Sequence, residues 1–208
     1  MTKTDTAETI HGGVQAWIHA GVGVWIFRVL LLAGAAFMVY SWFSPWWSAD
    51  VAVIRGPDDL VLHPWGIETV AQVRASSDPE LYSMPGFFAP FVWTYFAVAM
   101  LALAASLFVS KEISLGRIKL PVAAVLIAFV GLSYLVAVGL AYGIGELRSE
   151  AVDTNFIGKS EFRDPMTNRK IKMVSDLRDG YWYALYTGVA LFVLALLRGL
   201  FARKPKAK

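Results

Sequence analysis

The stretch YSWFSPWWSAD, from Tyr40 to Asp50, ends an apolar run with three tryptophans and a proline before the chain turns polar. Tryptophan and tyrosine concentrate where the hydrocarbon of a membrane meets water, and proline ends helices. The apolar run that leads into it and overlaps it, residues 29–46, is about as long as a helix that crosses a ~30 Å hydrocarbon layer at 1.5 Å per residue. The stretch therefore predicts the outer end of a first transmembrane helix.

The composition favours a membrane protein over a soluble domain. Of the 208 residues, 57% are hydrophobic and only 17% are charged, and the mean hydropathy is +0.53. The absence of cysteine excludes disulfides, thiolate metal sites and a catalytic thiol. The net charge is +3, but the basic residues do not form a face interleaved with aromatic residues, so we expect no nucleic-acid partner.

Three more apolar segments extend this prediction to an all-α integral membrane protein with a bundle of four transmembrane helices. They are residues 87–109, 118–144 and 181–201. Two long polar loops, 47–86 and 145–180, alternate with a short connection at 110–117, and a basic tail follows at 202–208. Within the first long loop, Val51–Ile54 and Leu60–His63 flank a turn-forming sequence, which predicts a small β-hairpin.

The N-terminal segment, residues 1–28, predicts an amphipathic helix lying in the membrane interface. Its apolar residues recur at spacings of three and four, while His11, Gln15 and His19 form one polar stripe. Arg28 follows at the start of the first span. Gln15, His19 and Arg28 are therefore candidate contacts for a lipid or quinone headgroup.

The distribution of charge predicts the orientation. The N-terminal segment, the short connection and the tail carry ten basic residues against three acidic ones, whereas the long loops carry nine against thirteen. Positively charged segments stay on the cytoplasmic side. We therefore expect both termini in the cytoplasm, both long loops outside, and the protein in the cytoplasmic membrane of a bacterium or archaeon.

Three further sets of residues stand out as candidate contacts. Aromatic residues at the outer ends of the spans are expected to anchor the protein in the interface or to dock a partner. Small residues four apart in the third span favour close helix packing, and basic residues in the tail favour anionic lipid. In that order, the sets are Trp42, Trp46, Trp47, Trp93, Tyr181, Trp182 and Tyr183; Ala124, Ala128, Gly139 and Gly143; and Arg203, Lys204, Lys206 and Lys208.

The sequence predicts no catalytic residue, cofactor or metal site. The second and third spans contain no charged residue or histidine in their cores, whereas ion-coupled transport needs such groups. The chain has three histidines and none inside a span, which argues against haem, copper and zinc. The serines near the first span have no histidine and aspartate at a suitable spacing.

Three hypotheses for the function follow. The favoured one is a non-catalytic accessory or structural subunit of a larger membrane complex, such as a respiratory or monooxygenase assembly, with lipids and other membrane subunits as partners. The alternatives are a quinone- or lipid-binding enzyme subunit and an outward-facing tetraspan protein of adhesion or signalling.

The order of spans and loops resembles the layout of claudin-like tetraspan proteins. Four spans, internal termini and a longer first outer loop with paired strands carry this architectural resemblance. The paired loop cysteines and the Trp, Gly-Leu-Trp signature of that family are missing from this sequence. The resemblance therefore implies a layout, and no barrier role or functional residue follows from it.

Overall fold

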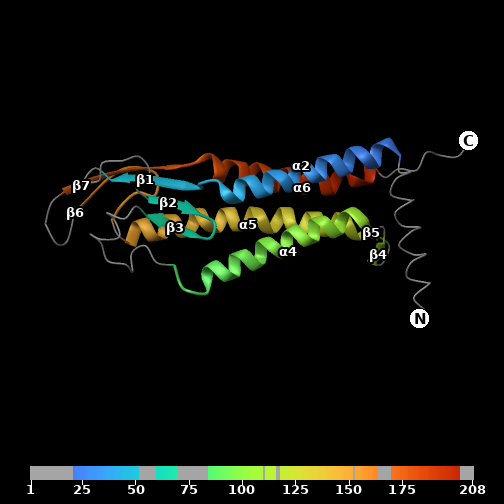
Figure 1. The fold of residues 1–208 in the computed structure, drawn as a ribbon, viewed down its shortest axis with the longest axis horizontal. Coiled ribbons are helices and arrows are strands. Elements are labelled where there is room, and N and C mark those ends of the chain that lie inside the picture. Colours follow the sequence, from blue (N-terminus) through green and yellow to red (C-terminus); the bar gives the residue numbers. More distant parts are fainter. Residues whose placement is uncertain are drawn as a thin grey trace, which may run out of the picture.

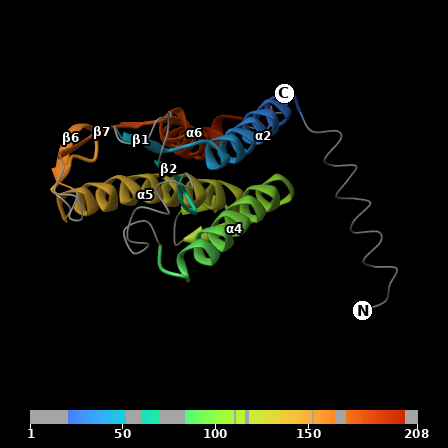
Figure 2. The ribbon, with the colours of Figure 1, turned by 60° about the vertical axis from the view of Figure 1, so that its left-hand side comes forward.

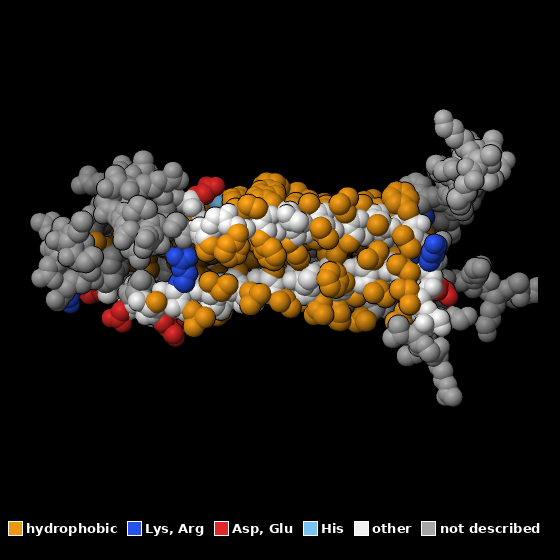
Figure 3. Space-filling model, turned by 90° about the horizontal axis from the view of Figure 1, so that it is seen from below, with side chains coloured by type: hydrophobic (Ala, Val, Ile, Leu, Met, Phe, Trp, Pro, Cys, Tyr) orange, Lys and Arg blue, Asp and Glu red, His pale blue; other side chains and the backbone are white. Residues whose placement is uncertain are grey.

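The computed structural model describes residues 21–51, 60–69, 84–109, 111–115, 118–151, 153–163 and 170–201. Four long helices run side by side: α2 (Val22–Phe43), α4 (Phe88–Phe108), α5 (Val122–Ala151) and α6 (Asp179–Phe201) (Figure 1). Each is long and apolar enough to cross a membrane. Hydrophobic side chains cover the middle of the bundle, and charged ones lie toward its ends (Figure 3). The prediction of four membrane-length helices is confirmed.

Helix α2 begins and ends earlier than predicted. Residues 22–28 belong to it rather than to an interfacial helix, whose remaining residues lie outside the described ranges. At its other end Ser44 has an extended backbone, with φ −82° and ψ 150°, and its hydroxyl donates to the carbonyl of Tyr40 at 2.8 Å. Pro45 disfavours helical backbone in the residue before it. Trp46 and Trp47 therefore lie beyond the helix.

The two long loops form one antiparallel sheet, so the prediction of an all-α protein is wrong. The strands are β1 (Trp47–Val51), β2 (Leu60–His63), β3 (Gly66–Thr69), β6 (Gly158–Arg163) and β7 (Lys170–Leu177), in the order β3-β2-β1-β7-β6. The central strand β1 pairs with β2 on one side and with β7 on the other. Trp47, for example, lies opposite Leu62 of β2 and Leu177 of β7. The sheet lies at one end of the bundle, here called the sheet end (Figure 1).

The predicted hairpin of the first loop is confirmed as the β1–β2 pair, although β1 starts at Trp47 rather than Val51. Residues 52–59, which include the predicted turn, lie outside the described ranges. At the opposite end of the bundle, β4 (Glu112–Leu115) and β5 (Ile118–Pro121) form a second hairpin in place of the predicted loop. This end, here called the hairpin end, also holds the start of α2 and the end of α6 (Figure 1).

The helices pack unequally. α6 packs along both α5 and α2, whereas α4 packs mainly on α5 and touches α2 little. Figure 2 shows α4 set apart from α2 and α6. The buried core of the bundle is correspondingly drawn from all four helices, with Leu31, Leu103, Ile127, Tyr134 and Leu191 among its most buried side chains.

Candidate functional site

An aromatic cluster joins α2, α4 and the sheet at the sheet end. Trp42 stacks on Phe96 with ring centroids 4.5 Å apart, and Trp93 stacks on Trp65 at 5.3 Å. Trp42 and Trp93 also meet edge to face at 6.0 Å, and His63 stacks on Trp65 at 4.7 Å. Aromatic pairs at such spacings contribute about 0.5–1.5 kcal/mol beyond the area they bury. The cluster therefore fastens α4 and the β2–β3 hairpin to α2.

Trp42 and Trp46 are core residues rather than surface anchors, which corrects the expectation for these two positions. Their side chains are only 2% and 3% exposed. The indole of Trp46 donates to the carbonyl of Ser41 at 2.8 Å, and its ring meets Tyr134 edge to face. Trp46 follows directly after residues 44–45, beyond the end of α2, and packs into the core of the bundle. Neither side chain is available to lipid or to a partner.

The other predicted aromatic residues fall into two groups. Trp93 and Trp182 are about 40% exposed and remain available to the surroundings. Trp47 is half-buried, stacks on the ring of Phe156 and donates its indole N–H to the carbonyl of that residue at 2.7 Å. Tyr181 and Tyr183 are half-buried at the start of α6. The ring of Tyr181 contacts that of Trp46, and the ring of Tyr183 contacts that of Tyr40.

His63 is the titratable group of this cluster. Its Nε2 lies 3.9 Å from a carboxylate oxygen of Glu68, and its buried Nδ1 has no hydrogen-bond partner in the structure. Burial lowers the pKa of His63 below its ordinary value, while Glu68 and a backbone hydrogen bond with Ser44 act in the opposite direction. The imidazole is therefore neutral at neutral pH.

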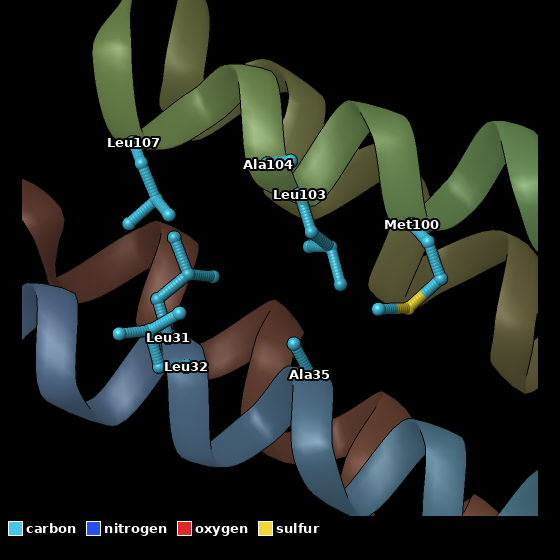
Figure 4. A pocket seen from close by; sticks show the side chains of 7 residues that line it. All are labelled: Leu31, Leu32, Ala35, Met100, Leu103, Ala104 and Leu107. Atoms are coloured by element: carbon cyan, nitrogen blue, oxygen red, sulfur yellow. The ribbon is translucent and has the colours of Figure 1, made fainter.

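An apolar groove, here called the α2–α4 groove, lies between two helices that touch each other little. Leu31, Leu32 and Ala35 line it from α2, and Met100, Leu103, Ala104 and Leu107 line it from α4 (Figure 4). No charged or hydrogen-bonding side chain is among them. Because both walls are membrane-length helices, the groove suits an apolar occupant rather than a polar substrate. None of its lining residues was among the candidates expected from the sequence.

Two arginines lie within membrane-length helices near the hairpin end. Arg28 on α2 is 9% exposed, and its guanidinium lies 5.4 Å from the ring centroid of Trp25. Arg198 on α6 lies over the ring of Phe27 at 5.4 Å, and its Nη1 is buried without a hydrogen-bond partner. Arg28 was expected from the sequence as a headgroup contact.

The remaining candidates contribute no site within the described residues. Gln15, His19 and the tail residues Arg203, Lys204, Lys206 and Lys208 lie outside those ranges. Ala124 and Ala128 are half-buried on α5, whereas a Cβ added to Gly139 or Gly143 would meet nothing within 4 Å. The described residues contain no group of three or more His, Cys, Asp or Glu side chains placed to hold a metal ion.

Comparison with known proteins adds no family to this description. No protein-family model matches the chain, and no curated protein matches it.

Proposed function

We propose that the protein is a non-catalytic accessory or structural subunit of a larger membrane complex, and that a transmembrane helix of a partner subunit docks in the α2–α4 groove. The observation that carries this proposal is the groove itself. Its walls are entirely apolar, and they belong to two helices that touch each other little.

The lining residues fit a helix better than a rigid cofactor. Ala35 lines the groove from α2 and Ala104 lines it from α4, both with short side chains, so a partner backbone can approach them closely (Figure 4). Leu and Met side chains flank them and adapt their shape to an incoming surface. Packing between helices in lipid depends on such close fit, because lipid tails are as apolar as the side chains they would replace.

The sheet at the end of the bundle supports the same role in docking a partner. Strands of both long loops pair directly, and the aromatic cluster fixes them to the ends of α2 and α4. In the proposed orientation this sheet stands outside the cytoplasmic membrane of a bacterium or archaeon and both termini lie inside, as the charge distribution favours. A partner that docks in the groove would then also meet a rigid outer surface. Respiratory and monooxygenase assemblies are candidate hosts.

Copurification with groove variants tests the proposal. In Ala104→Trp a bulky ring fills the α2–α4 groove, so a partner helix should be lost when the tagged protein is extracted from native membranes in mild detergent. Val98→Trp is the matched control, because Val98 lies on the opposite side of α4 and is 56% exposed. It should retain the partner in stoichiometric amount.

Two results would overturn the proposal. One is a wild-type protein that leaves the membrane as a stable monomer without partners. The other is a partner that stays bound to Ala104→Trp as firmly as to Val98→Trp, since that partner would not occupy the groove. Lipid alone in the groove, detected by mass spectrometry with no protein partner, counts as the first of these results.

A further inference from the structure

Arg28 and Arg198 lie at the same level near the hairpin end, on helices that are far apart in the sequence. The guanidinium of Arg198 packs 5.4 Å from the ring centroid of Phe27, which is the residue before Arg28 on α2. Helices α2 and α6 pack along each other here, and Phe27 is 6% exposed between them. Two positive charges are therefore held at one level of the bundle.

The described residues at this end offer Arg198 no carboxylate. Glu112 is the acidic residue of the hairpin end within those ranges, and its side chain is exposed. Nη1 of Arg198 is buried without a hydrogen-bond partner. A buried guanidinium nitrogen without an acceptor is costly in free energy, and the cost falls when an anion accepts its hydrogen bond.

We propose that Arg28 and Arg198 bind the phosphate of an anionic phospholipid in the leaflet at the hairpin end. The planar guanidinium donates two parallel hydrogen bonds to phosphate oxygens, and two arginines at one level match the charge of such a headgroup. Exposed apolar residues lie on the same helices within five positions of each arginine. Val29, Leu30, Val193 and Leu197, all 40% exposed or more, provide apolar area for the acyl chains.

This apolar surface favours a lipid over free phosphate. An inorganic ion would gain the hydrogen bonds but would leave these side chains without an occupant. A phospholipid satisfies both features with one molecule. This site is separate from the α2–α4 groove, so its test is independent of the proposed subunit role.

Unfolding in membranes of defined composition tests the site. The full chain is reconstituted in nanodiscs of phosphatidylcholine alone and of phosphatidylcholine mixed with phosphatidylglycerol, and native mass spectrometry counts the lipids that remain bound. The wild type should unfold at a higher temperature with phosphatidylglycerol and should retain it selectively. Inorganic phosphate added to the phosphatidylcholine nanodiscs should not reproduce the stabilisation.

Variants locate the effect. The double variant Arg28→Gln/Arg198→Gln should bind phosphatidylglycerol at least about tenfold more weakly, the size expected for losing charge-assisted hydrogen bonds. Arg148→Gln, at the sheet end of α5, should retain the preference. Neutralising Arg203, Lys204, Lys206 and Lys208 should retain it too, which separates this site from general attraction by the basic tail.

Three results would overturn the inference. They are a wild type that is equally stable with and without phosphatidylglycerol, stabilisation that inorganic phosphate reproduces, and a double variant that keeps the wild-type preference. If the double variant does not fold, the wild-type comparison between the two membranes and the tail variant still decide the question.

Discussion

Gly131 on α5 and Gly188 on α6 bring the backbones of their helices into direct contact. A Cβ added to Gly131 would lie 2.8 Å from the backbone nitrogen of Phe192 and 3.0 Å from the carbonyl oxygen of Gly188. A Cβ on Gly188 would lie 3.3 Å from the carbonyl oxygen of Gly131. The absence of side chains at both positions therefore permits the crossing of the two central helices.

Gly131→Ala should destabilise the bundle, because its methyl group meets backbone atoms that cannot rotate away. We expect a loss of about 1–3 kcal/mol in the free energy of unfolding, the usual cost of overpacking. Gly139→Ala on the same helix is the control, since a Cβ there meets nothing within 4 Å. Unfolding in mixed detergent, followed by circular dichroism, measures both variants. Equal stability of the two would contradict the crossing.

Gly180→Ala should loosen the junction between the sheet and α6. The backbone N–H of Gly180 donates to the carbonyl of Pro45 at 3.0 Å, and an added Cβ would overlap that carbonyl and lie 2.7 Å from the carbonyl oxygen of Ser44. We expect a loss of about 1–3 kcal/mol. Gly86→Ala, with open space around it, should be neutral. Near-ultraviolet circular dichroism of the tryptophans reports the junction, and an unchanged spectrum and stability would refute this view.

The buried hydrogen bond between the hydroxyls of Ser41 and Tyr134, 2.8 Å long, should couple α2 to α5. Ser41→Ala and Tyr134→Phe each remove one partner, so a double-mutant cycle isolates the interaction. We expect a coupling of about 0.6–1.7 kcal/mol, as found between helices in membranes. Ser133→Ala with Tyr134→Phe should show no such coupling, because Ser133 bonds Tyr95 instead. Strict additivity of the Ser41 and Tyr134 effects would contradict the prediction.

The aromatic cluster should weaken in mild acid. The pKa of His63 is lower in the folded protein than in the unfolded chain, chiefly because burial disfavours the imidazolium. The unfolded chain then binds more protons, so the stability that His63 contributes is complete above the unfolded pKa of 6.5 and is lost as the pH falls through the folded value.

His63→Phe keeps a ring beside Trp65 but removes the titration. Thermal unfolding measured from about pH 7 to about pH 5 should therefore decline more steeply for the wild type than for the variant. The difference between the two proteins cancels the contribution of the carboxylates. Parallel curves for wild type and variant would show that His63 does not titrate in this range in either state.

The helices were predictable from the sequence because length and hydropathy are local properties. The segments around Leu101, Val130 and Val193 are apolar over a full membrane width, and each forms a helix. The start of α2 was misplaced because Arg28 looked like a boundary, although a single arginine can lie within a helix when aromatic rings cover it.

The sheet was only partly predictable, because most of it depends on pairing between distant segments. The β1–β2 hairpin is local and was expected. In contrast, β7 pairs with β1 although two of the membrane-length helices, α4 and α5, lie between these strands in the chain. Dependence on distant segments also explains why the burial of Trp42 and Trp46 was not predicted. Their position at the end of an apolar run suggests a lipid interface, but burial is decided by Phe96, Tyr134 and the strands that fold over them.

The central position of β1 also sets the order in which the protein can be completed. Trp47 pairs with Leu62 soon after both have been synthesised, but its other edge pairs with Leu177, 130 positions later in the chain. Until then, the nascent protein carries an open strand edge that could pair with another chain. Closing a loop of this length is slow compared with forming a local hairpin. The sheet is therefore completed only once β7 has been synthesised, and a ribosome that stalls before residue 170 leaves a product with this edge open and prone to aggregation.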